Sequence, residues 1–205
     1  EFFDALPIKQ FLKKEKKWYE RHVKFVHDKK LEYLDIPFDM QKFENEIKFK
    51  ISYKQKFIEY SPLATKYLKT IINKIKLNNG GVLIIDYAYL EKRMKNTLQA
   101  VSKHKYCDVL KNFRNSDITY NLSFNLINKI IEKSGPCLSL STNQKKFLTK
   151  LGILDRAEIL SKNMPFSKKA DIYFRIKRLI DENQMGHLFK VMFITNQKNK
   201  FRLGF

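Results

Sequence analysis

The run from Gly80 to Tyr87, Gly-Gly-Val-Leu-Ile-Ile-Asp-Tyr, constrains the fold of this chain more than any other feature. Four apolar residues follow the two glycines without a polar residue between them, and the run ends at Asp86 and Tyr87. Such a run is typical of a strand buried on both faces, in a sheet with helices above and below. In open α/β sheets the functional groups lie just beyond the carboxyl ends of the strands. The sequence therefore predicts an α/β sheet with Asp86 and Tyr87 at its functional edge.

Helical and strand-like patterns alternate along the chain, which favours an α/β domain. Ser61 and Pro62 suit the start of a helix, because the hydroxyl accepts an unpaired N–H and proline needs none. Asn78 to Gly80 tolerate the left-handed turn that closes this helix. We expect helices over residues 8–19, 61–78, 123–134, 144–151, 155–162 and 167–181. We expect strands over residues 22–26, 31–34, 47–51, 57–60, 81–85, 106–110, 137–141, 188–194 and, at an edge, 201–205.

The strands expected between residues 22 and 60 differ from the central run. Apolar and charged residues alternate in them, as in Ile47-Lys48-Phe49-Lys50-Ile51. Alternation indicates a strand with one face in water. We therefore expect residues 22–60 to form a β-hairpin insertion at the rim of a single domain that comprises residues 1–205.

The charge of the chain limits the choice of partners. The net charge is +20, from 41 Lys and Arg residues against 21 Asp and Glu, but only seven of the 41 are arginine. Arginine makes the forked contacts to phosphates and bases, whereas lysine is a solvated point charge. Nucleic acid is therefore a disfavoured partner. Cys107 and Cys137 have no spacing typical of zinc sites or disulfide frameworks, which fits a reducing compartment. No apolar run approaches the about 20 residues that span a bilayer.

A series of short motifs resembles one known family. These motifs are Glu1-Phe2-Phe3-Asp4-Ala5-Leu6-Pro7, Trp18 with Glu20-Arg21, Ser61-Pro62, Ile85-Asp86-Tyr87, Thr97-Leu98-Gln99-Ala100, Asp117-Ile118-Thr119, Gln144 with Phe147-Leu148, Leu151-Gly152-Ile153, and Met185-Gly186 with Leu188-Phe189-Lys190-Val191. In this order and spacing they resemble the MidA family of S-adenosylmethionine-dependent methyltransferases, which includes a mitochondrial complex I assembly factor with protein-arginine methyltransferase activity.

The resemblance implies the C-terminal part of a class I, Rossmann-like methyltransferase sheet with an antiparallel last strand. In that family the glycine-rich loop and the acid that bind S-adenosyl-L-methionine precede the region matching Glu1. The sequence contains no comparable loop, because Gly80-Gly81 precedes a strand rather than following one. We therefore expect no cofactor-binding residue in this chain and an N-terminal cofactor-binding half outside it, which is a candidate partner as a separately encoded chain.

Methylation of an arginine nitrogen needs carboxylates that orient the guanidinium and compensate its charge. By resemblance the catalytic candidates are Glu1 and Asp4, after the expected fourth strand, with Asp86 and Tyr87. Thr119 and Gln144 are candidate substrate-binding residues, and no metal ligands are expected. Each candidate also has a structural alternative. Glu1 could be only a chain-end residue, Asp4 a helix cap and Asp86 a loop cap. Tyr87 could be a buried tyrosine with a satisfied hydroxyl, and Thr119 and Gln144 could simply close turns.

Several polar positions depart from the family pattern. Ala88 stands in place of a glycine, Asn121 and Ser123 in place of a His and an Asp, and Asn143 and Lys145 in place of a threonine and a glycine. These replacements motivate a second hypothesis, a non-catalytic assembly or protein-binding factor on a decayed methyltransferase fold.

The first hypothesis is a protein-arginine methyltransferase fragment that supplies the substrate side of the site and is inactive alone. By resemblance its substrate is a protein, with a respiratory complex I subunit as the candidate. Its compartment is the cytoplasm in a bacterium or the mitochondrial matrix in a eukaryote. A basic nucleic-acid binder is the third hypothesis.

Overall fold

A computed structural model describes residues 1–26, 30–111 and 114–205 of the chain. Its strands are β1 (Lys9–Lys14), β2 (Lys17–Phe25), β3 (Leu31–Pro37), β4 (Phe57–Tyr60), β5 (Gly81–Tyr89), β6 (Gln99–Ser102), β7 (Lys105–Cys107), β8 (Asp117–Thr119), β9 (Leu122–Ser123), β10 (Cys137–Asn143) and β11 (Phe189–Asn196). Its helices are the 3-10 helix η1 (Phe3–Ala5) and α1 (Met40–Ile47), α2 (Pro62–Asn78), α3 (Phe124–Ser134), α4 (Gln144–Lys150), α5 (Ile153–Ser161), α6 (Phe166–Ile180) and α7 (Met185–Leu188). The mixed α/β composition confirms the predicted fold class.

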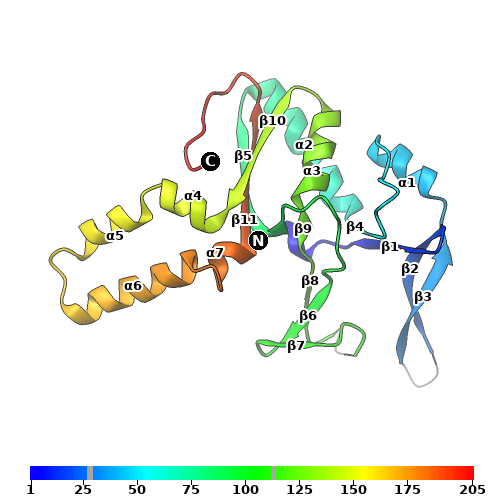
Figure 1. Ribbon diagram of the computed structural model, residues 1–205, viewed down its shortest axis with the longest axis horizontal. Helices are drawn as coiled ribbons and strands as arrows, with labels where there is room; N and C mark the ends of the chain where they lie inside the picture. Colours follow the sequence, from blue (N-terminus) through cyan, green and yellow to red (C-terminus); the bar gives the residue numbers. More distant parts are fainter. Residues whose placement is uncertain (27–29, 112–113) are drawn as a thin grey trace.

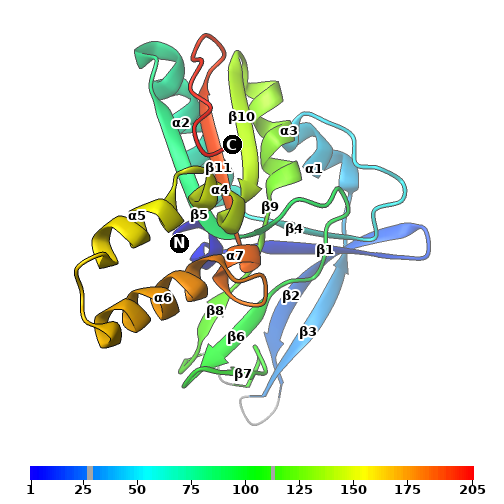
Figure 2. The ribbon, with the colours of Figure 1, turned by 60° about the vertical axis from the view of Figure 1, so that its left-hand side comes forward.

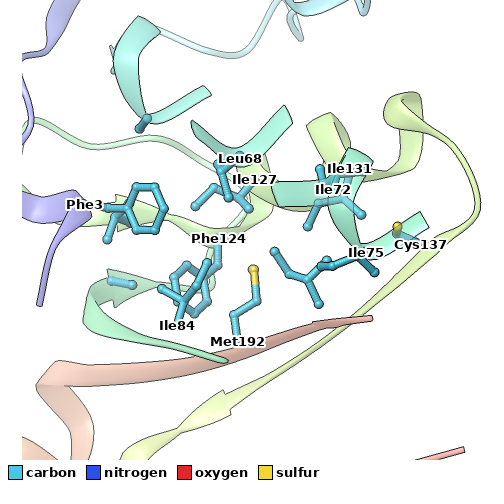
Figure 3. Close-up of a cluster of buried hydrophobic side chains, with 14 of the residues drawn as sticks. Phe3, Leu68, Ile72, Ile75, Ile84, Phe124, Ile127, Ile131, Cys137 and Met192 are labelled. Atoms are coloured by element: carbon cyan, nitrogen blue, oxygen red, sulfur yellow. The ribbon is translucent and has the colours of Figure 1, made fainter. Parts of the chain in front are cut away.

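The main sheet has the strand order β10-β11-β5-β9, and β5 is the predicted apolar run. β11 is antiparallel to both β5 and β10, so the expected antiparallel last strand is confirmed. α2 and α3 cover one face of this sheet, where Leu68 and Ile72 of α2 meet Ile127 of α3, Ile84 of β5 and Met192 of β11 (Figure 3). Burial of these side chains contributes most of the driving force for this half of the fold.

The opposite face of the sheet is covered differently from the prediction. A helix was expected there, but the rings of Phe201 and Phe205 pack against Phe193 of β11, with centroid distances of 5.5 and 6.2 Å. The expected edge strand 201–205 is therefore wrong. This segment has aromatic side chains that stack on the sheet face, and its backbone does not join the ladder of strands.

A second sheet has the order β3-β2-β1-β4 and corrects two predictions. The helix expected over residues 8–19 is wrong, because this segment is the hairpin of β1 and β2 with Glu15 in the left-handed conformation at its turn. β1 also pairs with β4, a contact that joins residues about 50 positions apart. The sheet begins at Lys9, before the expected insertion boundary at residue 22. The polar turn expected between the strands at residues 22–26 and 31–34 includes residues 27–29, which lie outside the described residues.

The strand expected over residues 47–51 is also wrong. Ile47 is the last residue of α1, which begins after Asp39, whose carboxylate accepts the N–H of Gln41. Phe43 and Ile47 are one helical turn apart and are both buried. Their helical spacing, with the cap at Asp39, outweighs the short alternation that continues to Ile51.

Helix α3 belongs to two hydrophobic cores. Ile127 and Ile131 pack into the core under the main sheet, whereas Leu126 and Ile130 pack with Phe11 and others under the second sheet. The hydroxyl of Ser123 caps the helix by accepting the N–H of Leu126. α5 and α6 form a helical hairpin that projects away from both sheets (Figure 1). Among the described residues, no helix is long and apolar enough to cross a membrane.

Candidate functional site

A cavity of about 800 Å³ lies at the carboxyl end of β5. The N-terminal residues form one wall, and a three-stranded sheet of order β7-β6-β8 forms another. Figure 2 shows this small sheet extending from the end of the main sheet, with the N-terminus between the two. The charged and polar residues that line this cavity are Glu1, Asp4, Tyr87, Gln99, Tyr106, Ser116, Asp117, Thr119 and Asn121. We call it the acidic pocket, because it contains three carboxylates and no lysine or arginine.

Asp86 holds the N-terminal segment in place. Its Oδ2 accepts the N–H groups of Phe2 and Phe3 at 3.1 and 2.9 Å, and its Oδ1 accepts the N–H of Tyr87 at 2.8 Å. The nitrogen of Glu1 donates to the carbonyl of Ile85 at 2.9 Å. Asp86 is only 1% exposed and does not line the acidic pocket. The geometry therefore gives Asp86 a positioning role, and its neighbour Tyr87 faces the pocket.

Asp4 lies on η1, the short helix that begins at Phe3, whose N–H is bound by Asp86. Its side chain is buried, and its backbone carbonyl accepts the N–H of Tyr120 at 3.1 Å. Burial, which is the largest cause, and the negative charges of Asp86 and Glu1 together raise the pKa of the Asp4 carboxyl to about 6. A cation in the pocket would stabilise the ionised form of Asp4, because its positive charge would offset the repulsion from Asp86 and Glu1.

Tyr87 and Thr119 complete the set of predicted residues that the structure brings together. The Tyr87 ring packs on Phe189 with a centroid distance of 4.3 Å, and burial followed by the charges of Glu1 and Asp4 raises the pKa of its hydroxyl. Thr119 lies on β8, where its Oγ1 accepts a hydrogen bond from Gln99 Nε2 at 3.2 Å. Glu1, Asp4, Tyr87 and Thr119 thus line one cavity, although they come from three segments of the chain.

Gln144 lies apart from this set. It begins α4 at the end of β10, is buried, and donates from Nε2 to the carbonyl of Leu179 at 2.9 Å. It is not among the residues that line the acidic pocket. This contact ties α4 to the end of α6, so the geometry supports the structural alternative for Gln144.

Several pocket residues were not identified from the sequence. Asp117 is two residues before Thr119 on β8, and alternate residues of a strand point to the same side, so the spacing could have revealed it. Gln99 and Tyr106 lie on β6 and β7, and only the three-stranded sheet brings them to the pocket. Asn121 also lines the pocket, and its Oδ1 is buried without a hydrogen-bond partner in the described part of the chain. This orphaned acceptor favours a ligand with N–H donors.

The positions of the glycines show whether the chain can form a glycine-rich turn that binds a nucleotide-type cofactor. Gly80 and Gly81 lie at the start of β5, at the opposite end from Tyr87, so they cannot form a phosphate- or carboxylate-binding turn beside the pocket. No other pair of adjacent glycines exists in the sequence. The glycines of this sequence therefore provide no turn that fits the S-adenosyl group. Within the described ranges, no cluster of three or more His, Cys, Asp or Glu side chains is arranged to hold a metal ion.

The fold defines this protein as a mixed α/β protein with methyltransferase-like structural neighbours. A Burkholderia thailandensis protein that was crystallised with bound S-adenosyl-homocysteine superposes with a TM-score of 0.78 and 24% sequence identity. The alignment covers 100% of this chain and 54% of that chain. A second structure from the same organism gives a TM-score of 0.78 over 99% of this chain, at 23% identity.

The sequence model of the family Methyltransf_28, S-adenosyl-L-methionine-dependent methyltransferases, matches residues 1–141, and the chain belongs to this family. The family resemblance expected from the motifs is therefore confirmed, with S-adenosyl-L-methionine as the cofactor of the family. The chain is also similar to the mitochondrial protein arginine methyltransferases NDUFAF7 of Xenopus tropicalis, at 28% identity over 96% of this chain, and of Homo sapiens, at 26% over 92%. The alignments cover 46% and 42% of those relatives, so the chain spans less than half their length.

Proposed function

We propose that residues 1–205 form the substrate side of a protein-arginine methyltransferase site, and that the cofactor-binding side is supplied by polypeptide outside these residues. The acidic pocket carries this proposal. It collects three carboxylates, an unpaired amide oxygen and two tyrosine rings beside the end of β5. A guanidinium is a planar cation with five N–H donors, which matches a pocket rich in acceptors and negative charge.

Each group has a definite part in holding an arginine side chain. Asp4 and Glu1 accept hydrogen bonds and compensate the positive charge, and Asn121 Oδ1 accepts a further N–H. The rings of Tyr87 and Tyr106 are suited to pack on the flat faces of the cation. Asp86 acts indirectly, by fixing the backbone that carries Glu1 and Asp4. Together these contacts restrict the guanidinium to one orientation, which is the main requirement for a transfer reaction at one nitrogen.

The free edge of β5 supports the second part of the proposal. One edge of β5 pairs with β11 from Gly81 to Tyr87, but within the described residues the other edge pairs only with β9, at Ala88 and Tyr89. A hollow of about 410 Å³ runs along this free edge. Natural sheets protect exposed edges with charges, prolines or bulges, whereas Gly81 to Ile85 contain none of these side chains. An edge of this kind fits a further strand, such as one from a cofactor-binding half.

The arginine site can be tested with the chain alone. Titration with a short end-blocked peptide, in which one arginine is the only charged residue, should shift the NMR signals of the Gln99 and Asn121 side-chain amides. Asp4→Asn should weaken this binding about tenfold, because one carboxylate contact is lost. Binding should also strengthen between pH 5 and pH 7, as Asp4 loses its proton. Glu44→Gln is the matched control, since Glu44 pairs with Lys50 outside the pocket. Equal affinity for a lysine peptide, or no effect of Asp4→Asn, would contradict an arginine site.

Cofactor binding should require the missing side. Isothermal titration of this chain with S-adenosyl-L-methionine should show no saturable binding in the micromolar range, because the chain lacks the glycine-rich turn. Micromolar affinity would show that the cofactor-binding residues are present after all. S-adenosyl-homocysteine serves as a second probe in the same experiment, since its binding does not depend on the methyl group.

A second candidate is a non-catalytic assembly or protein-binding factor. The replacement of polar residues of the family pattern at Asn121 and Ser123 favours it, because Ser123 now caps α3 and Asn121 has an unpaired oxygen. A methyl-transfer assay separates the two candidates. The chain is mixed with the cofactor-binding half of a member of this family, a labelled methyl donor and a protein substrate that contains arginine. Turnover that depends on both halves would exclude the non-catalytic candidate, whereas binding of a protein substrate without turnover would favour it.

The names of the relatives suggest a setting for this activity. They are mitochondrial proteins described as protein arginine methyltransferases. By extension, the proposed partner is a protein substrate, and the family resemblance described above makes a respiratory complex I subunit the candidate. The proposed compartment is the mitochondrial matrix in a eukaryotic cell and the cytoplasm in a bacterial one.

A further inference from the structure

A second cavity, of about 710 Å³, has the opposite charge from the acidic pocket. The two cavities share no lining residue. The cations that line it come from three segments: Lys54 and Lys56 before β4, Lys92 and Arg93 after β5, and Lys129 on α3. No aspartate or glutamate is among its lining residues. We call it the basic cavity.

The concentration of cations exceeds what the lysine-rich composition provides. Lysine and arginine make up 41 of the 205 residues, or one in five, but five of the eight residues that line the basic cavity. The carboxylates near these segments are bound elsewhere: Glu44 pairs with Lys50, Glu91 pairs with Lys95, and Glu59 accepts the N–H groups of Thr97 and Leu98. In the described part of the chain, none of the five cations forms an ion pair within 4.0 Å. Their mutual repulsion is therefore left uncompensated by the protein.

The base of the cavity is built from ordered groups. Gln55 is only 6% exposed, and its Nε2 donates to the carbonyls of Phe57 and Met94 at 2.5 and 3.1 Å. These bonds tie the segment that carries Lys54 and Lys56 to the segment that carries Lys92 and Arg93. The side chain of Gln55 therefore links the two segments that carry these two pairs of cations.

Helix α3 forms the third wall and adds to the positive potential. Asn125 lies in its first turn and Lys129 one turn later, both facing the cavity. The amino end of a helix carries a partial positive charge, which favours an anion nearby. Lys129 Nζ lies 5.2 Å from the centroid of the Phe49 ring, a contact that orients the ammonium group.

We propose that the basic cavity binds a small molecule carrying at least two linked phosphate groups. Five cations exceed the charge of a single phosphate, and a cavity of this volume is within the range of small-molecule sites. Arg93 supplies a fork for two phosphate oxygens, the lysines supply point charges, and Asn125 supplies an amide donor. This site goes beyond the proposed methyl transfer, which needs neither the cavity nor a phosphate.

Inorganic pyrophosphate is the simplest probe. Isothermal titration of the whole chain at about 50 mM salt should give one saturable site, with affinity that falls as salt is added. The triple variant Lys92→Gln, Arg93→Gln, Lys129→Gln should weaken binding at least about tenfold. The matched control, Lys168→Gln, Lys177→Gln, Arg178→Gln, removes the same charges from exposed positions of α6 and should leave the affinity within about twofold, since these charges are remote.

A single substitution tests the site without removing a cation. Asn125→Asp places a carboxylate in the cavity, at a first-turn helix position where an acid is favourable for folding. It should keep the thermal stability of the chain and lower pyrophosphate affinity. In the unchanged chain, pyrophosphate should shift the NMR signals of the Gln55 and Asn125 side-chain amides.

Three results would overturn the proposal. The first is the absence of a saturable site at low salt. The second is equal weakening in the two triple variants, which would show attraction to net charge alone. The third is binding of citrate as tightly as pyrophosphate, which would show that the cavity does not distinguish phosphates from carboxylates. None of these results depends on methyl transfer, so the proposed function is tested separately.

Discussion

Asp86→Asn is expected to lower the free energy of unfolding by about 3 kcal/mol, because a buried carboxylate that accepts three backbone N–H groups is replaced by an amide. The amide keeps one acceptor oxygen, and its NH₂ group then faces backbone donors. The N–H groups of Phe2 and Phe3 lose their acceptor, so the segment that carries Glu1 and Asp4 should separate from the end of β5. Urea unfolding measures the stability loss, and hydrogen exchange at Phe3 measures the release of the segment.

Asp117→Asn is the control for this experiment. Asp117 is an exposed acid of the same pocket, so its loss should change stability by no more than about 0.5 kcal/mol. Arginine-peptide binding should fall in both variants, but only Asp86→Asn should lose protection at Phe3. If Asp86→Asn retained both stability and Phe3 protection, the positioning role of Asp86 would be wrong.

Asp4→Asn is expected to stabilise the protein at neutral pH by about 2–3 kcal/mol, from a pKa of about 6 in the folded chain and 3.8 for the ordinary carboxyl. A raised pKa means that the folded state holds this proton more tightly than the unfolded state does. Ionised Asp4 therefore lowers stability as pH rises from about 4 to about 6, and the penalty is constant above that range. The asparagine side chain cannot ionise and escapes this penalty.

The measurement is the difference in unfolding free energy between Asp4→Asn and the unchanged chain at a series of pH values. This difference should be small near pH 4 and reach its plateau above pH 6. Glu44→Gln should behave oppositely, because the hydrogen bond from Lys50 lowers the pKa of Glu44, so its contribution is lost as pH falls. A difference for Asp4→Asn that stayed flat across pH would show that Asp4 is not perturbed. Asp4→Asn should therefore make the chain more stable and weaken arginine binding, because the ionised carboxylate that destabilises the fold is the group that binds the arginine.

The sequence predicted β5, β10 and β11 of the main sheet, although not β9, because β5 and β11 have strong local signals. β5 has an unbroken apolar run, and β11 has a largely apolar run that follows the short helix α7. α2 and α3 have polar caps at Ser61 and Ser123 and apolar stripes at helical spacing. Each of these signals lies within one element, so no knowledge of distant contacts was needed.

The second sheet was predicted poorly because its order depends on distant contacts. Phe11, Leu12 and Trp18 have a spacing that also fits a helix, and only pairing of β1 with β4 decides in favour of a strand. The same limit applies to the pocket. Asp117 shares a strand face with Thr119, but the approach of β8 to the N-terminal segment is visible only in the fold.

The assignment of Asp86 and Tyr87 illustrates a rule that the sequence already contained. Successive residues of a strand point to opposite sides, so two adjacent residues of β5 could not both face one pocket. The structure places Tyr87 at the pocket and turns Asp86 toward the backbone of Phe2 and Phe3. Asp86, which the sequence suggested as a catalytic residue, thus holds the backbone segment that carries Glu1 and Asp4.

The position of α3 between two cores governs how the protein loses its structure. Ile127 and Ile131 serve one sheet, while Leu126 and Ile130 serve the other, so neither sheet can detach without exposing half of the helix to water. The exposure cost falls on both halves at once, which makes partial melting unfavourable. Heating should therefore give one sharp, all-or-none transition in calorimetry, despite the two separate sheets.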